Sequence, residues 1–214
     1  MNELTTPSTL GRLRALAPRR DRVSFDDALR VAELQATRLQ ELLGADVGVH
    51  ESGLAALPRI AIKYEDIAVS GMSHWNGQEW VIVLHRGDGW ARQRFTLLHE
   101  FKHIVDHGHS ANLYSGDRKL TSDQQSERAA DFFAGCALVP RRQLKAAWGH
   151  GIQRLAELAI HFGVSEDAMT VRLSQTGLST AVDNDPVPRC ARPIATPART
   201  HPQRVQPSRT ARHT

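Results

Sequence analysis

The sequence lacks the features that mark secreted, disulfide-stapled or membrane-spanning proteins. It has two cysteines in 214 residues, Cys136 in an apolar stretch and Cys190 in a Pro/Arg-rich end, and no Cys-x-x-Cys pair. No apolar run approaches the roughly 20 residues that a helix needs to cross a bilayer. Residues 1–20 contain no apolar core that would serve as a secretory signal. We therefore expect a protein of the cytoplasm, without a disulfide and without a membrane partner.

Positive charge is concentrated at one end of the chain. The formal net charge is +4 and the sequence pI is about 9.5, values that invite a nucleic-acid interpretation. Residues 183–214, however, hold six arginines and two aspartates, so residues 1–182 sum to zero. DNA binding is therefore not expected of the body. For the tail, a weak contact with a polyanion stays open beside a merely solubilising role.

The composition also divides the chain into segments. The basic end contains six of the ten prolines and few aliphatic residues, so it buries too little surface to offset its ordering entropy. We expect an N-terminal extension over 1–20, one folded domain over 21–181, and a disordered Pro/Arg-rich tail over 182–214.

Periodicity predicts strands early and helices late in the folded domain. Ser24 and Gly44 fit the two caps of a first helix. Asn76-Gly77 is typical of a hairpin between extended residues 67–75 and the strand 79–85. Further segments complete the pattern: extended residues at 60–63 and helices near 90–107, 122–138, 152–162 and 166–176. The predicted class is α+β, a small antiparallel sheet packed on a mainly helical body.

The strongest chemical signal is the His-Glu-x-x-His motif at residues 99–103. Residues four apart share one face of a helix, so His99 and His103 can place two imidazoles on one Zn²⁺ ion. Glu100 lies one residue round from His99 and reaches water at the metal rather than the metal itself. The motif predicts a metal centre with Glu100 as its catalytic acid/base.

A third ligand has to come from elsewhere. Glu127 and Asp131 lie four apart on the next helix, where Glu127 can take the metal and Asp131 can accept a hydrogen bond from the free nitrogen of His99. His109 is the alternative, since it occupies the third-histidine position of His-Glu-x-x-His-x-x-Gly-x-x-His. That pattern needs a glycine where this chain has Asp106, which favours Glu127.

At this point the sequence resembles the ImmA/IrrE family of metallo-endopeptidases. The resemblance extends over residues 25–178. It rests on RFTLLHEFKHIVDH (94–107), the preceding WVIVLHR (80–86), SERAADFFAGCALVP (126–140) and FGVSEDAMTVRLSQTGL (162–178). The resemblance implies a zincin-like metallopeptidase core, with zinc, or Mn²⁺ in its place, held by His99, His103 and Glu127.

The family likeness also implies a substrate. Family members cleave or inactivate helix-turn-helix repressors, in mobile-element induction, stress responses or toxin–antitoxin-like pairs. Peptide hydrolysis needs a further donor to stabilise charge on the scissile carbonyl, and Tyr114, His107 and His109 are the candidates for this role.

A different class of function stays open. Residues 155–175 have the spacing of a helix-turn-helix, but the second helix begins with Glu166 and Asp167 and offers only Arg172 to phosphate. The alternative to a peptidase is thus a DNA-binding protein, or a toxin–antitoxin-type regulator that binds a repressor without cleaving it.

Overall fold

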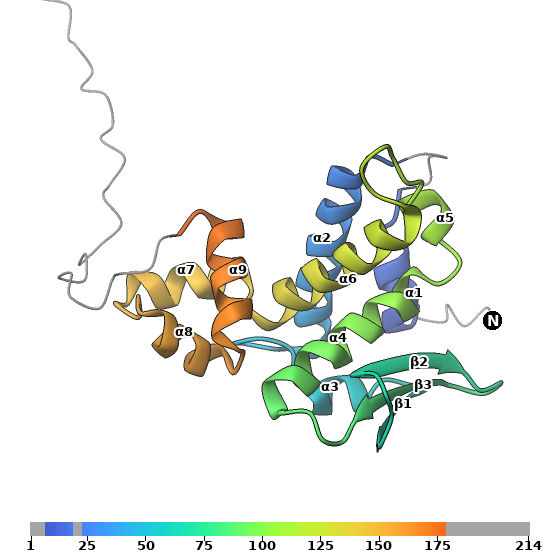
Figure 1. Ribbon diagram of the computed structural model, residues 1–214, viewed down its shortest axis with the longest axis horizontal. Helices are drawn as coiled ribbons and strands as arrows, with labels where there is room; N and C mark the ends of the chain where they lie inside the picture. The colour runs from blue at the N-terminus through green and yellow to red at the C-terminus, as the bar shows by residue number, and fades with distance from the viewer. Residues whose placement is uncertain (1–6, 19–22, 179–214) are drawn as a thin grey trace, which may run out of the picture.

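The computed structural model describes residues 7–18 and 23–178. The expected disorder of 182–214 lies outside these residues. Figure 1 shows three parts: a central group of helices, a sheet below α4, and a separate cluster of α7, α8 and α9. The elements in chain order are α1 (Thr9–Arg14), α2 (Phe25–Leu43), α3 (Glu51–Ala55), β1 (Ile60–Glu65), β2 (Gly71–Trp75), β3 (Trp80–His85), α4 (Trp90–Asp106), α5 (Ser110–Leu113), α6 (Ser122–Leu138), α7 (Arg141–Gly149), α8 (Leu155–Phe162) and α9 (Glu166–Thr176).

The predicted mainly helical α+β class is confirmed, and capping residues mark both ends of α2 and the start of α6. The side chain of Ser24 accepts a hydrogen bond from the Asp27 backbone, and Gly44 ends α2 in the left-handed conformation with φ 62°. Thr121 and Gln124 form a reciprocal capping box at the start of α6. Local sequence therefore sets the bounds of α2 and the start of α6, the helix that carries Glu127.

The sheet is mixed, which corrects the expectation of an antiparallel one. Its strand order is β1-β3-β2; β3 pairs antiparallel with β2 and parallel with β1. The residues from Val81 to Leu84 are all buried, and such a continuous apolar run suits a central strand that is covered on both faces. Since β3 is the central strand and β2 occupies one of its edges, β1 pairs with the other edge of β3, in the parallel direction. The hairpin itself is present, with four residues, 76–79, between the paired strand ends.

The core is centred on α6, which packs on both α2 and α4. Its fully buried positions include four alanines, at 129, 130, 134 and 137. Small side chains allow neighbouring helices to approach closely, so α6 can lie between two helices at once. The helix α1 also belongs to this core. It lies in the segment expected to be an extension, yet Leu13 is fully buried in the main cluster.

Three arginines satisfy carbonyl groups at helix ends, which have no partners within their own helices. Arg14 donates to two carbonyls in the last turn of α4. Arg94 donates to two at the end of α8. Arg172 donates to the Val139 carbonyl just after α6. These contacts join α1, the α7–α9 cluster and the central helices into one body.

None of the described helices is both long and apolar enough to span a bilayer.

Gly48 gives a test of the packing around the end of α6. It has φ +138°, and a Cβ added there would lie 2.4 Å from the Leu138 carbonyl oxygen. We expect Gly48→Ala to lower the free energy of unfolding by about 1–3 kcal/mol from backbone strain, before any clash is counted. Chemical denaturation measures this. The control is Gly149→Ala at the end of α7, where no atom lies within 4 Å of the new Cβ; an equal loss there would contradict the argument.

Candidate metal centre

Two helices bring the predicted metal ligands together. His99 and His103 lie one turn apart on α4, and Glu127 lies on the facing helix α6. His99 Nε2 is 3.1 Å from His103 Nε2. The carboxylate of Glu127 lies 3.2 Å from His99 Nε2 and 3.3 Å from His103 Nε2. The three side chains therefore point at one place, and they form a group that could hold a metal ion.

These separations fit a zinc ion. Ligands bound tetrahedrally at 2.0–2.1 Å are about 3.3 Å apart, close to the three distances observed. The second ring nitrogen of His99, Nδ1, lies 2.8 Å from Asp131 Oδ1. With a proton on Nδ1 donated to Asp131, the lone pair of Nε2 points into the gap between the three side chains. This is the orientation that a metal-binding histidine needs.

The charges around the gap favour a cation within it. Burial lowers the pKa of His99, but the hydrogen bond to Asp131 and the negative charges nearby outweigh it, so this pKa is raised overall. Burial and the neighbouring His99 lower the pKa of His103. The acidic side chains thus attract positive charge to the pair, while His103 favours its neutral, ligating form. A metal ion in the gap would meet both conditions, because it brings the positive charge that a proton would otherwise supply and binds to neutral histidines.

Glu100 has a partner that the sequence analysis missed. Ser73 on β2 donates a hydrogen bond of 2.8 Å to Glu100 Oε2. The strand lies so close to α4 that a Cβ on Gly71 would be 2.4 Å from the Thr96 side chain. The two-residue period of a strand places Gly71, Ser73 and Trp75 on one face. That period was visible in the sequence, but which face meets α4 was not.

The other candidate donors and ligands lie in different surroundings. His109 is the N-cap residue of the short helix α5 and is not part of the group of possible metal ligands found in the described residues. The His107 ring packs against Trp80, with ring centroids 4.9 Å apart. Tyr114 is buried and donates its hydroxyl to Asp106. The Tyr114 hydroxyl thus has its hydrogen-bond partner in the core, and its role as a transition-state donor stays a prediction.

Asp106 belongs to a buried polar network behind the metal-binding face of α4. Lys102 Nζ lies 2.5 Å from Asp106 Oδ1 and 2.8 Å from Gln35 Oε1 on α2. Burial lowers the pKa of Lys102, and Asp106 opposes that shift. The network ties α4 to α2 on the side away from the gap, so it restrains the helix that carries both histidines.

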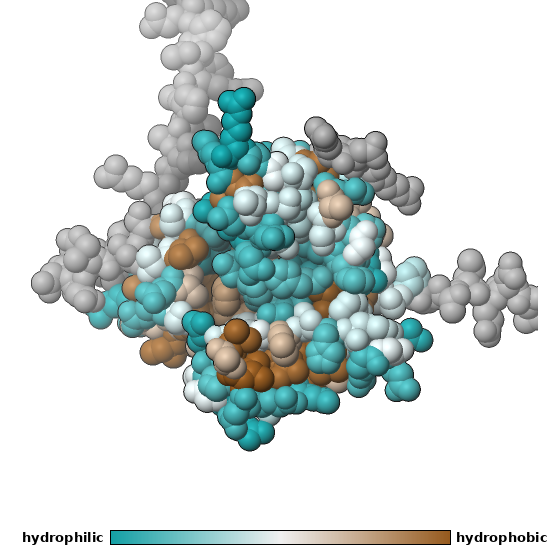
Figure 2. Space-filling view, turned by 45° about the vertical axis from the view of Figure 1, so that its right-hand side comes forward, coloured by the Kyte–Doolittle hydropathy of each residue, from teal (hydrophilic) through white to brown (hydrophobic). Residues whose placement is uncertain are grey.

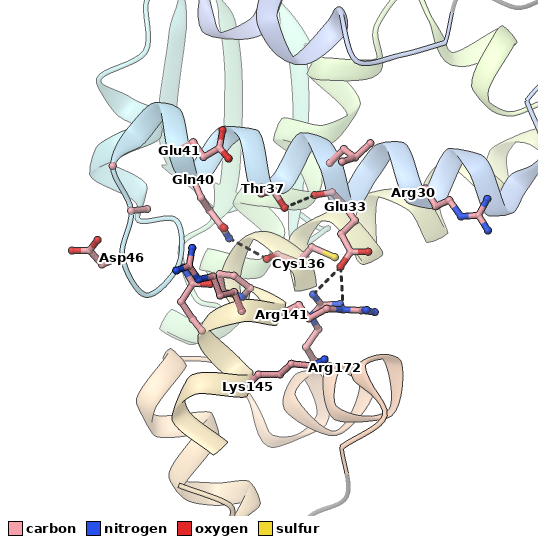
Figure 3. Close-up of a pocket in the computed structure, with 16 residues that line it drawn as sticks. Arg30, Glu33, Thr37, Gln40, Glu41, Asp46, Cys136, Arg141, Lys145 and Arg172 are labelled. Atoms are coloured by element: carbon pink, nitrogen blue, oxygen red, sulfur yellow. Dashed lines mark hydrogen bonds and ion pairs between the residues drawn. The ribbon is translucent and has the colours of Figure 1, made fainter. Parts of the chain in front are cut away.

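A separate cavity of about 920 Å³ lies between α2 and the α7–α9 cluster. Figure 3 shows Glu33 at its centre, with Arg141 and Arg172 directed at the Glu33 carboxylate from 3.4 and 3.8 Å. Burial raises the pKa of Cys136 in its wall to about 12. The thiol therefore stays protonated near neutral pH and packs as a core residue, as its apolar surroundings in the sequence suggest.

Comparisons with known proteins agree with this geometry. Residues 59–174 match the family described as IrrE N-terminal-like domain (Peptidase_M78). The range spans more than half of the chain and includes α4 and α6 with the grouped side chains. A search of curated proteins finds no match.

A solved structure described as "Mycobacterium tuberculosis transcriptional regulator" has a similar fold, with a TM-score of 0.58 and 18% sequence identity. The alignment covers 78% of this chain and 52% of that chain, so the present chain spans about half the length of the solved structure. At this level of identity the likeness concerns the fold.

Substitutions separate the two candidate third ligands. We expect Glu127→Ala to lower zinc affinity by at least about 100-fold, because it removes one of three protein ligands. His109→Ala should change zinc affinity by less than about 2-fold, since its side chain is not among the grouped ligands. Competition with a chromogenic chelator measures both. The reverse ranking would identify His109 as the ligand.

Proposed function

The chain belongs to the family of IrrE N-terminal-like domains, Peptidase_M78, and on that basis we propose that it is a zinc-dependent endopeptidase. The observation that carries the proposal is the convergence of three ligand atoms from α4 and α6 beside the carboxylate of Glu100. A metal-dependent hydrolase needs a metal site and a base close to it, and this chain has His99 and Glu100 on adjacent residues.

The residues have distinct roles. His99, His103 and Glu127 hold the metal, which is zinc with Mn²⁺ as the alternative, and Asp131 holds the His99 ring in its ligating orientation. The chemistry that zinc supplies when bound is Lewis acidity, which makes water nucleophilic near neutral pH and polarises a carbonyl group.

Glu100 moves the proton. It takes a proton from the attacking water and passes it to the amine that leaves when the peptide bond breaks. Ser73 supports this role by donating to Glu100 Oε2, which holds the carboxylate in place beside the ligands. Each proton transfer thus occurs at a carboxylate whose position is set from both α4 and β2.

The edge strand β2 is the proposed binding site for the substrate backbone. Among the described strands β2 pairs only with β3, so its other edge can pair with an extended peptide. Three apolar residues in or next to β2 are exposed: Val69, Met72 and Trp75. Figure 2 shows apolar residues gathered in the lower part of the view, at the level of the sheet. An apolar strand edge next to the base suits a locally unfolded segment of a protein.

The proposed substrate is a helix-turn-helix repressor, in keeping with a cytoplasmic role in transcription regulation or stress. Backbone pairing along one short strand gives weak affinity, so we expect most of the affinity to come from docking of the partner on another surface. The helices α8 and α9 are the proposed surface for that docking.

DNA binding by α8 and α9 is the less favoured alternative. Arg172 is the arginine that the helix-turn-helix pattern offers to phosphate, but it is buried and donates to the Val139 carbonyl. The start of α9 is acidic, with Glu166 and Asp167. A regulator that binds a repressor without cutting it has no use for Glu100 and its Ser73 partner.

The role of the base is tested by Glu100→Gln. Because Glu100 is not a ligand, we expect zinc affinity to stay within about 2-fold, while hydrolysis falls by about 10²–10⁴-fold with the loss of general base catalysis. Ser73→Ala should reduce kcat by about 5–10-fold at unchanged zinc affinity, the effect of one hydrogen bond. Near-normal cleavage by Glu100→Gln would overturn the mechanism.

Substrate choice is tested with purified zinc-loaded protein. It should cut a co-encoded helix-turn-helix repressor at one position, cut casein poorly, and lose activity on chelation, because affinity comes mainly from docking. Intact mass spectrometry of the products locates the cut. Broad digestion of unrelated unfolded proteins, or failure to cut any co-encoded regulator with zinc or manganese present, would refute the proposed substrate class.

A further inference from the structure

An apolar groove of about 700 Å³ opens beside the metal centre. It lies between α4, α6, α9 and the start of α2. Its walls are apolar side chains that are only partly buried or exposed, so they have unused contact surface. Six of them are Phe25, Leu29, Phe95, Phe132, Ala168 and Val171.

The groove continues the two helix faces that carry the ligands. Phe95 lies one turn before His99 on α4, and Asp131 lies one turn after Glu127 on α6. Asp131 both lines the groove and bonds to His99. The groove therefore begins where the ligand cluster ends, and a chain held at the metal has a side-chain path into it.

Gly135 keeps the groove open. It lies inside α6, where a glycine makes the helix less stable than an alanine would. Apart from the backbone of α6 itself, no atom lies within 4 Å of the place its Cβ would take, so packing does not require a glycine there. Gly135 lines the groove, and any side chain at this position would project into that space.

We propose that this groove binds a bulky apolar side chain of the substrate, next to the bond that is cut. The inference rests on the proposed function and adds a specificity-determining surface to it. Much of the lining is apolar, and exposed charged side chains of both signs stand around it, Arg92 and Arg128 together with Asp131 and Asp167. Segment 183–214 of this chain follows α9 in sequence but holds six arginines, six prolines and few aliphatic residues, so it has few apolar side chains to place in the groove. An apolar residue of a partner protein suits the groove better.

Two hydroxamates that differ in one side chain provide the test. Acetohydroxamic acid and 3-phenylpropanohydroxamic acid bind a metal through the same group, and the second adds a phenyl group on a short linker. With the zinc-loaded full-length protein, we expect the phenyl compound to bind about 10-fold tighter or more, as burial of an aromatic side chain predicts. Affinity is measured by calorimetry, which requires no catalysis.

Gly135→Leu should fill the groove. We expect it to reduce the phenyl advantage to about 2-fold or less while the affinity for acetohydroxamic acid stays unchanged, because only apolar burial is lost. Gly149→Leu is the matched control, a helical glycine with open space around it outside the groove. Val171→Asp on the groove wall is a second variant, with Ile160→Asp on exposed α8 surface as its control.

The possible outcomes distinguish a wrong assignment of the groove from a wrong assignment of the metal centre. If acetohydroxamic acid fails to bind the zinc-loaded wild type, the metal centre is wrong and the inference falls with it. If it binds but the phenyl compound gains nothing, or gains equally in Gly135→Leu, only the groove assignment is overturned. Displacement of the phenyl compound by a synthetic 183–214 peptide, or a dimer that Gly135→Leu dissociates, would assign the groove to the tail or to a second copy instead.

Discussion

The close approach of α4 and α6 is the constraint on which the site depends. Two ligands come from one helix and the third from the other, so a shift of either helix would separate atoms that now lie 3.1–3.3 Å apart. Small residues on α6 make the approach possible, and Phe101 and Phe133 meet where the two helices pack, with ring centroids 6.4 Å apart. Close-packed interiors resist such shifts, so the packing of the two helices fixes the spacing of the three side chains that could hold a metal ion.

The same helix α4 is restrained on its remaining sides by polar contacts. Lys102 and Asp106 form a buried ion pair whose remaining hydrogen-bonding groups are taken up by Gln35 and Tyr114. A buried pair adds little net stability, but removing one partner costs about 3–5 kcal/mol. Its value here is positional, because it links α4 to α2 and to the chain after α5. Ser73 on β2 adds a hydrogen bond to Glu100, so the part of α4 that carries the proposed ligands and the proposed base is restrained by groups outside this helix.

The sequence alone was sufficient for what depends on local periodicity and capping. The long helices, the hairpin and the four-residue spacing of His99 and His103 follow from patterns within one segment. Contacts between distant segments could not be predicted from the sequence. The parallel pairing of β1 depends on which side of β3 is free, and Ser73 becomes a partner of Glu100 only through the packing of β2 on α4. Nothing in the sequence around Lys102 indicates that its side chain is buried, since its partner Gln35 is 67 residues away.

The paired faces of α4 and α6 change character along their length, and this gradient has a functional consequence. Near Glu127 they are acidic and imidazole-rich, whereas beyond Asp131 and Phe95 they become apolar. In the proposed mechanism, water and protons are handled at the first part, and apolar contact with the substrate is made at the second. A substrate strand bound along β2, as proposed, would have its backbone beside Glu100, and its side chains would alternate between solvent and the helix faces. The side chains directed at the helices would then meet polar groups at the bond to be cut and apolar groups beside it, and this difference would fix the register of the strand against the proposed base.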